Sequence, residues 1–170
     1  MAQEFKELKA AVAKRRIAKY SPDWAPLDLT EFSSITEEAA ELVSQAEEGE
    51  VDLRNLNEIS DKVAEHLGNH KGSLGLGGLK SLSVSSATSL ARHDGWLHMG
   101  IEELDDDAAL ALSKGTVTLN LTGLKSLNAT PGHIALAGKL VSDGTDNRLY
   151  SLQNVAKEII DKFPSLKQSD

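Results

Sequence analysis

Apolar residues recur along the chain in five copies of the pattern apolar-x-apolar-x-x-apolar-x-x-apolar, of which the fourth is one residue shorter. The copies start at residues 27, 51, 74, 97 and 119, so they are spaced 24, 23, 23 and 22 residues apart. The third and fifth copies, LGLGGLKSLS and LNLTGLKSLN, share the string GLKSL. The apolar positions are, copy by copy, Leu27, Leu29, Phe32, Ile35; Val51, Leu53, Leu56, Ile59; Leu74, Leu76, Leu79, Leu82; Leu97, Met99, Ile101, Leu104; and Leu119, Leu121, Leu124, Leu127. Such a period predicts a repeat architecture in which each unit buries its apolar face against its neighbours.

Each copy predicts a short strand followed by a helix. At its start, apolar and other residues alternate with the period of a strand. The residue after the fourth apolar position favours a helix N-cap, because its short side chain can accept a hydrogen bond from a free backbone N–H. These cap residues are Thr36, Ser60, Ser83, Asp105 and Asn128. We therefore expect each repeat to be a strand, a turn and a helix of two to three turns, with the chain returning to the next parallel strand.

Within each expected helix, a small residue is followed three positions later by a mostly larger one, which favours close packing on the neighbouring helix. The pairs are Ala40/Val43, Ala64/Leu67, Ala87/Leu90, Ala109/Leu112 and Gly132/Ala135.

The pattern weakens at both ends of the chain. Residues 2–20 predict an amphipathic helix, which the prolines of the segment SPDWAP end. Its apolar positions are Phe5, Leu8, Ala11 and Val12. After the polar loop SDGTDN, a helix over about 152–163 is expected to face Val155, Ile159 and Ile160 inward, as either a degenerate sixth repeat or a closing cap. The chain thus divides into an N-terminal cap and linker (1–26), five repeats (27–137) and a polar loop with a C-terminal cap (138–170).

The repeats resemble the leucine-rich repeat family, in the simplified form found in many bacterial proteins. In that form a Leu-x-Leu-x-x-Leu-x-x-Leu strand and turn lead into a short Ala- and Leu-rich helix and a turn that contains His or Gly. The resemblance implies an α/β solenoid with a short parallel sheet on one face, helices on the other and helical caps at both ends. It also implies that the sheet binds other proteins. The usual Asn or Cys ladder falls on Phe32, Leu56, Leu79 and Leu124 here, so we expect no such side-chain ladder.

Charge and composition disfavour several classes of binding partner. The chain of 170 residues has a formal net charge of −8, which disfavours nucleic acid and anionic membranes. It contains no cysteine, so disulfide and thiolate chemistry are excluded. The N-terminus lacks the apolar run of a signal peptide, and no stretch of about 18 apolar residues occurs, so we expect a cytoplasmic protein. Residues 1–20 hold six Lys or Arg, whereas residues 27–50 hold eight Asp or Glu. Both charge clusters would be explained if the basic helix lies against this acidic first repeat.

Several motifs suggest ligand chemistry but have a structural explanation. The string GLGGLKS lacks the spacing of a phosphate loop, and its counterpart from Leu119 lacks two of the three glycines. His66 and His70 have the spacing of two zinc ligands on a helix, but no third ligand is near. His70 and His93 instead occupy equivalent positions, where we expect them to bond the last carbonyls of their helices.

The acidic residues that suggest a cation-binding site also have a structural explanation. Asp105, Asp106 and Asp107 suit a helix N-terminus. Asp143, Asp146 and Asn147 lack the spacing and the closing Glu of a calcium loop. No nucleophile, base and orienting acid form a set, so the sequence predicts no catalytic site, no metal and no cofactor.

What remains is the face of the expected sheet, where the residues between the apolar positions point outward. The candidate partner-binding residues are Asp28, Asp52, Arg54, Gly75, Gly77, His98, Asn120 and Thr122, with Thr30 and Gly100 on the same face. The alternative is a plain solvated sheet. Trp24 and Trp96, at repeat entrances, are either packed at an edge, which we favour, or interface anchors.

The sequence thus predicts a non-catalytic module that binds a protein partner through the sheet. A homotypic assembly unit that stacks through its ends is the alternative, and a metal-dependent regulator or enzyme is a third.

Overall fold

The computed structural model describes residues 6–145 and 148–167, which form an α/β fold with parallel sheets. Phe5 lies outside these residues. The elements are β1 (Glu7–Leu8), α1 (Ala10–Ile17), β2 (Leu27–Asp28), β3 (Ser34–Ile35), α2 (Glu37–Ser44), β4 (Gly49–Asp52), α3 (Asp61–Leu67), β5 (Gly72–Leu76), α4 (Val84–Leu90), β6 (Trp96–Met99), α5 (Asp106–Ser113), β7 (Thr118–Asn120), β8 (Ser126–Leu127), α6 (Pro131–Ser142), β9 (Asn154–Val155), α7 (Lys157–Lys162) and the 3-10 helix η2 (Pro164–Leu166).

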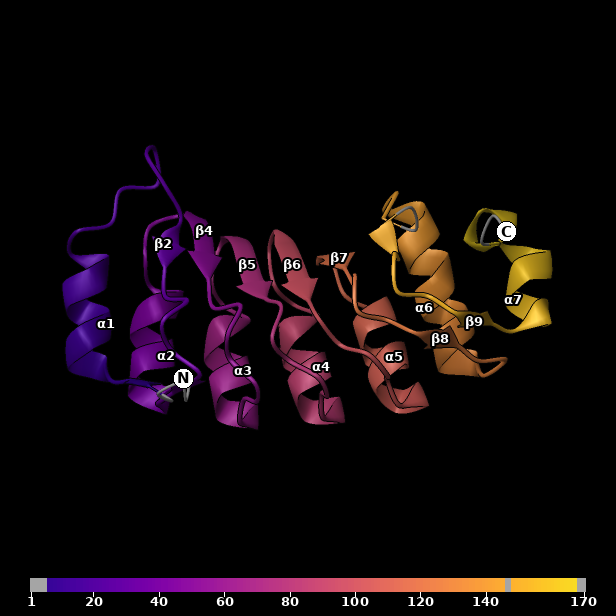
Figure 1. Ribbon diagram of the computed structural model, residues 1–170, viewed down its shortest axis with the longest axis horizontal. Coiled ribbons are helices and arrows are strands. Elements are labelled where there is room, and N and C mark those ends of the chain that lie inside the picture. Colours follow the sequence, from indigo (N-terminus) through magenta and orange to yellow (C-terminus); the bar gives the residue numbers. More distant parts are fainter. Residues whose placement is uncertain (1–5, 146–147, 168–170) are drawn as a thin grey trace, which may run out of the picture.

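The main sheet has five parallel strands in chain order, β2-β4-β5-β6-β7. Its register aligns the first apolar position of all five copies, since Leu27 pairs with Val51, Val51 with Leu74, Leu74 with Leu97 and Leu97 with Leu119. The helices lie in a row beside the sheet, each from α1 to α6 packed on the next (Figure 1). The predicted units of strand, turn and helix, and the parallel sheet, are confirmed.

The core lies between the sheet and the row of helices. Of the twenty apolar positions, eighteen are buried, and Ile35 and Ile59 are partly buried. Burial of each leucine contributes about 1.5–3 kcal/mol. The third apolar position of each repeat is buried, and the turn there is closed by backbone hydrogen bonds such as Leu56 N–H to Leu53 O, 3.0 Å.

The predicted caps are confirmed in the first three repeats. The hydroxyls of Thr36, Ser60 and Ser83 accept backbone N–H bonds of 3.2, 3.2 and 3.0 Å. Asp105 stands at the N-cap of α5, but its side chain makes no capping bond.

The predicted cap Asn128 is wrong. Helix α6 begins two residues later, with Thr130 at its N-cap, because Pro131 suits the first helical position. The shift also moves the inward face: Leu136 and Ala137 are buried, whereas Ala135 of the predicted pair is only partly buried. The other four predicted pairs are buried as expected.

The N-terminal helix is shorter than the sequence predicted. Leu8 lies in β1, beside Ile35 of β3, and Thr36 N–H donates to Leu8 O at 3.0 Å. Leu8 therefore takes the place of a fourth apolar position, and α1 takes the place of a repeat helix. The basic helix does lie against the first repeat, since α1 packs on α2 and Arg16 pairs with Glu31.

The C-terminal segment has the same arrangement. Val155 is in β9 beside Leu127 of β8, not in a helix as expected, and α7 begins at Lys157. Leu152 N–H donates to Leu149 O at 3.1 Å, as the third apolar residue of a repeat does. Ile159 is buried, whereas Ile160 is only partly buried. Among the described residues the helix row therefore extends one unit beyond the five-stranded sheet at each end (Figure 1).

The turns that enter the strands hold neighbouring repeats together. His70 and His93 are fully buried, and their Nε2 atoms lie 3.2 and 3.0 Å from the carbonyl oxygens of Gly49 and Gly72. Their rings stack with centroids 6.1 Å apart. The expected bonds to the last helix carbonyls are made by the backbone, since the N–H groups of His70 and His93 donate to Leu67 O and Leu90 O at 3.1 and 3.0 Å. The rings instead lie at the entrance of the preceding strand.

Candidate interaction surface

The register of the main sheet sets five candidate residues in one row. Asp28 pairs with Asp52, Asp52 with Gly75, Gly75 with His98 and His98 with Asn120. The apolar residues that alternate with them point into the core, so the row lies on the face away from the helices.

A hollow of about 350 Å³ lies on this face. It is lined by Glu50, Asp52, Arg54, Asn55, Gly75, Gly77 and His98. Five of these seven residues are among the sequence candidates, whereas Asp28, Asn120 and Thr122 lie outside the hollow. Glu50 was missed although it shares the strand face of Asp52 at a spacing of two residues. Asn55 follows the strand in a turn, where no period marks it.

Gly75 and Gly77 form the open centre of the hollow. A Cβ atom on Gly75 would lie 3.5 Å from Asp52 Oδ1, and one on Gly77 would lie 3.4 Å from His98 Cδ2. Both are ordinary contact distances, so the fold does not require glycine at either position. Gly100, expected to be exposed on the same face, is instead buried, and its Cβ would lie 1.9 Å from Gly77 O.

Asp52 and Arg54 form the polar wall of the hollow. Asp52, expected to be exposed, is only 6% exposed because Arg54 covers it. Its Oδ1 accepts bonds from the backbone N–H of Arg54 at 3.1 Å and from Nε at 2.9 Å, and Oδ2 pairs with Nη2. The Arg54 side chain remains 64% exposed. The carboxylate therefore fixes the guanidinium at the surface, where its remaining N–H groups can meet a partner.

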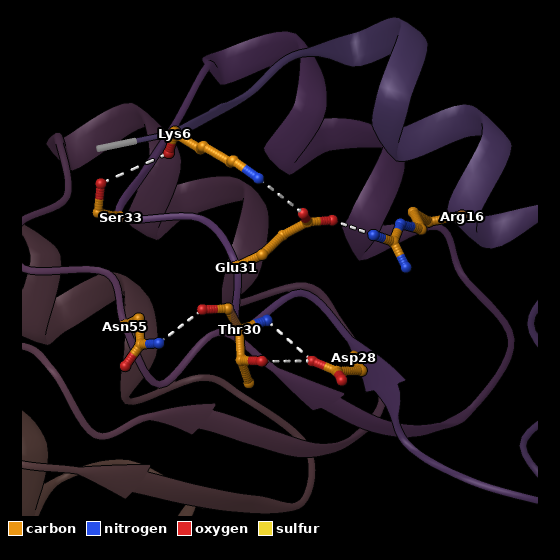
Figure 2. Close-up of polar contacts among 7 residues, drawn as sticks. All are labelled: Lys6, Arg16, Asp28, Thr30, Glu31, Ser33 and Asn55. Atoms are coloured by element: carbon orange, nitrogen blue, oxygen red, sulfur yellow. Dashed lines mark hydrogen bonds and ion pairs between the residues drawn. The ribbon is translucent and has the colours of Figure 1, made fainter. Parts of the chain in front are cut away.

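Asp28 and Thr30 form a similar turn on the first strand (Figure 2). Asp28 Oδ1 accepts bonds from the backbone N–H and the hydroxyl of Thr30, at 2.9 and 2.7 Å. These two bonds lower the pKa of Asp28. Asn55 Nδ2 donates to Thr30 O at 2.6 Å, which ties the rim of the hollow to the first repeat.

His98 and Asn120 continue the row beyond the glycines. Burial, and next the positive charge of Arg54, lower the pKa of His98, while Asp52 acts against them. The imidazole is therefore neutral at pH 7 and can donate one hydrogen bond and accept another. Asn120 Oδ1 is buried and has no hydrogen-bond partner within the described chain. The row thus offers hydrogen-bonding groups on both sides of an open centre.

The other candidate motifs have structural roles. Gly75 lies in β5, Lys80 pairs with Glu102 at 3.0 Å, and α4 begins only at Val84, so no helix opens directly after the glycines. His66 lies in α3, whereas His70 lies beyond its end and is bonded to Gly49 O.

The acidic candidates are also engaged within the protein. Asp106 Oδ1 accepts the backbone N–H bonds of Gly132 and His133 at 2.7 and 3.1 Å, and so caps the next helix. Asp143 pairs with Lys139 at 3.0 Å, while Asp146 and Asn147 lie outside the described residues. No group of three or more metal-ligating side chains occurs in the part of the chain that the structure describes.

The two tryptophans differ in environment. Trp96 is 43% exposed, and the guanidinium carbon of Arg148 lies 4.8 Å from its ring centroid. Trp24 is 89% exposed, so the favoured interpretation of edge packing is wrong for this residue. No helix within residues 6–145 and 148–167 is long and apolar enough to cross a membrane.

Comparison with known proteins gives no relative: no family model matches the chain, and no curated protein or solved structure matches it.

Proposed function

We propose that the protein is a non-catalytic interaction module that binds a protein partner through the face of its main sheet. The observation that carries this proposal is the hollow at Gly75 and Gly77, where glycine is not needed by the backbone. Gly75 lies within β5, where a larger side chain normally adds stability, and Gly77 lies in the turn that follows without a positive φ. Two glycines without a structural need are explained if an open surface is needed instead.

We further propose that the architecture is a leucine-rich-repeat-like solenoid that works in the cytoplasm. The chain-ordered parallel sheet, the common register and the row of helices support it. In such an array each repeat contacts mainly its neighbours, so the sheet remains available along its length.

The hollow suits a protruding side chain of the partner. Its volume of about 350 Å³ holds one or two side chains, and the polar groups of Arg54, Asp52 and His98 surround the opening. A partner segment that fills the hollow would desolvate these groups while offering them hydrogen bonds, which is typical of a specific binding site.

The variant Gly75→Ile tests the proposal. Its side chain would fill the hollow, while its Cβ meets no neighbour closer than 3.5 Å. Isoleucine also favours strand conformation. We expect an unfolding free energy equal to or above that of the unmodified protein, together with loss of the partner in affinity capture from the source cell.

Thr122→Ile is the matched control, because Thr122 is on the same face but outside the hollow. It places the same isoleucine side chain on the face outside the hollow, with a smaller gain in bulk, and should leave capture unchanged. Equal capture by Gly75→Ile and the unmodified protein would contradict the proposed site.

Self-assembly through the ends is a second candidate function. It is favoured by the absence, within the described residues, of a further strand beside β2 or β7, although a helix continues the row at each end. Sedimentation over a concentration series tests it, and a constant monomer mass at high concentration would exclude it.

A further inference from the structure

A second surface lies at the N-terminal end of the molecule, away from the hollow on the sheet. Trp24 stands there in the loop between α1 and β2, and its side chain is 89% exposed. It borders a separate hollow of about 280 Å³ that is also lined by Arg16, Lys19, Tyr20 and Pro26. A tryptophan side chain that is almost fully exposed beside a hollow leaves a large apolar area in water. Such a residue is typical of a binding site, where a partner buries this area.

The same end carries cations that the protein itself does not neutralise. Lys6 and Arg16 both pair with Glu31 (Figure 2). Lys14, Arg15 and Lys19 are exposed and form no ion pair within the described chain. Arg15 and Lys19 are four residues apart at the end of α1, where like charges repel each other. The helix dipole favours cations at this end, but it does not account for the exposed Trp24.

We propose that this N-terminal end surface binds an acidic segment of a protein partner. The surface consists of Lys19 and Trp24 at the hollow, with Lys14 and Arg15 in the last turn of α1. Carboxylates of the segment would pair with the three cations, and an apolar side chain would enter the hollow beside Trp24. Tryptophan and basic side chains together form a common type of binding hot spot. The surface is separate from the hollow at Gly75, although Asp28 of the sheet face lies at its edge, and this proposal does not rest on the proposed function.

A polypeptide fits this surface better than an anionic membrane does. Asp23 directly precedes Trp24 and is exposed, and Asp28 lines the hollow. Insertion of Trp24 into a lipid surface would bring the Asp23 carboxylate among the lipid phosphates, which repel it. A peptide segment can instead place its own carboxylates on α1 and keep them away from these two aspartates.

The test uses the full chain, immobilised, and a random dodecapeptide display library. We expect the bound peptides to be enriched in Asp and Glu together with one large apolar residue. A selected peptide is then synthesised and titrated in the Trp96→Phe background, where Trp24 is the only tryptophan. Binding should shift the Trp24 emission to shorter wavelength and weaken by at least about tenfold between about 0.05 M and 0.5 M salt.

Three variants assign the binding to the surface. The triple variant K14E/R15E/K19E and the variant W24A should each weaken binding of the synthetic peptide at least about tenfold. Isothermal titration calorimetry measures these affinities, because W24A lacks the fluorescent reporter, and circular dichroism should show unchanged folding. Gly75→Ile fills the other hollow and should leave the affinity unchanged, so that failure of the two proposed sites can be told apart. Selected peptides without an excess of acidic residues, or equal binding by the triple variant, would overturn the proposal. So would a Trp24 emission shift with phosphatidylserine vesicles in the absence of any peptide binding.

Discussion

Four glycines of the third and fourth repeats lie in two regions, at the strand entrances and on the sheet face, and of these only the two at the entrances are required by the backbone. At the strand entrance, Gly72 and Gly95 stack on neighbouring repeats, and a Cβ on Gly95 would lie 1.9 Å from Gly72 O. On the sheet face, Gly75 and Gly77 leave ordinary contact distances for a Cβ. Glycine at the entrance is explained by the fold, whereas glycine on the face is not. The comparison therefore separates residues that build the repeats from residues that keep a surface open.

The largest expected effect comes from Gly95→Ala at the strand entrance. Its φ of +139° is unfavourable for alanine, and the added Cβ would overlap a backbone carbonyl that cannot move alone. We expect unfolding free energy to fall by about 3–5 kcal/mol. Urea denaturation followed by circular dichroism measures it, and a loss below about 1 kcal/mol would show that the repeats do not stack as closely as described.

The next largest effect is a loss of folding stability at acid pH. Its cause is His70 and His93, which bond neighbouring repeats together at the same strand entrances. Burial is the main cause that lowers the pKa of both His70 and His93 below the value of 6.5 for an unfolded chain. The hydrogen bonds to the carbonyls of Gly49 and Gly72 and, more weakly, the charges of Glu48 and Asp94 act against it. The unfolded chain therefore binds more protons below pH 6.5 than the folded one. The contribution of the two histidines to stability is complete above about pH 6.5 and is lost as the pH falls towards the lowered native values.

The double variant H70Q/H93Q tests this cause, because glutamine can donate to the glycine carbonyls but does not titrate. Denaturation at about pH 7 and about pH 5 should show a smaller acid loss than in the unmodified protein. His66→Gln is the control, since His66 is partly exposed on α3. An undiminished acid loss in the double variant would assign the sensitivity to other groups.

The repeated skeleton of the fold follows from single residues of the sequence. The period-two apolar positions and the caps Thr36, Ser60 and Ser83 predicted strands and helices correctly, because they depend on contacts within one repeat. Helix α6 was misplaced because Thr130 and Pro131 compete with Asn128 as a helix start. Leu8 was assigned to a helix because its strand partner, Ile35, is distant in sequence.

The candidate surface was predictable only in outline. Strand alternation places Asp52, Gly75 and His98 on one face, and the sheet register confirms that they are neighbours. Alternation does not reveal that Arg54 covers Asp52, nor that Gly100 is enclosed by the backbone of Gly77. Such contacts between repeats depend on the stacking distance and the turn geometry, which no single repeat encodes.

A smaller effect on stability is expected from Asp52→Asn. Asp52 is a polar residue at the border of the open face. Asparagine can still accept the backbone bond from Arg54, but the charge of the ion pair is lost. Because the Arg54 side chain is 64% exposed, the cost in unfolding free energy should be only about 0.5–1 kcal/mol. Asp28→Asn is the matched control and should change stability by less, since Asp28 is exposed and its two bonds to Thr30 can persist. A larger loss for Asp28→Asn would reverse the assignment of the structural carboxylate on this face.

The smallest effect is expected for Gly77→Ala. This variant tests whether the glycines on the sheet face, unlike those at the strand entrances, are dispensable for the fold. A methyl group there meets His98 at 3.4 Å and Arg54 Cβ at 3.7 Å, and it restricts the unfolded chain. We expect the unfolding free energy to stay within about 0.5 kcal/mol or to rise slightly. Denaturation beside Gly95→Ala provides the measurement under identical conditions. A loss above about 1 kcal/mol would mean that Gly77 also has a structural role. The hollow would then be a by-product of packing, and the argument for a binding site at the centre of the sheet would lose its main support.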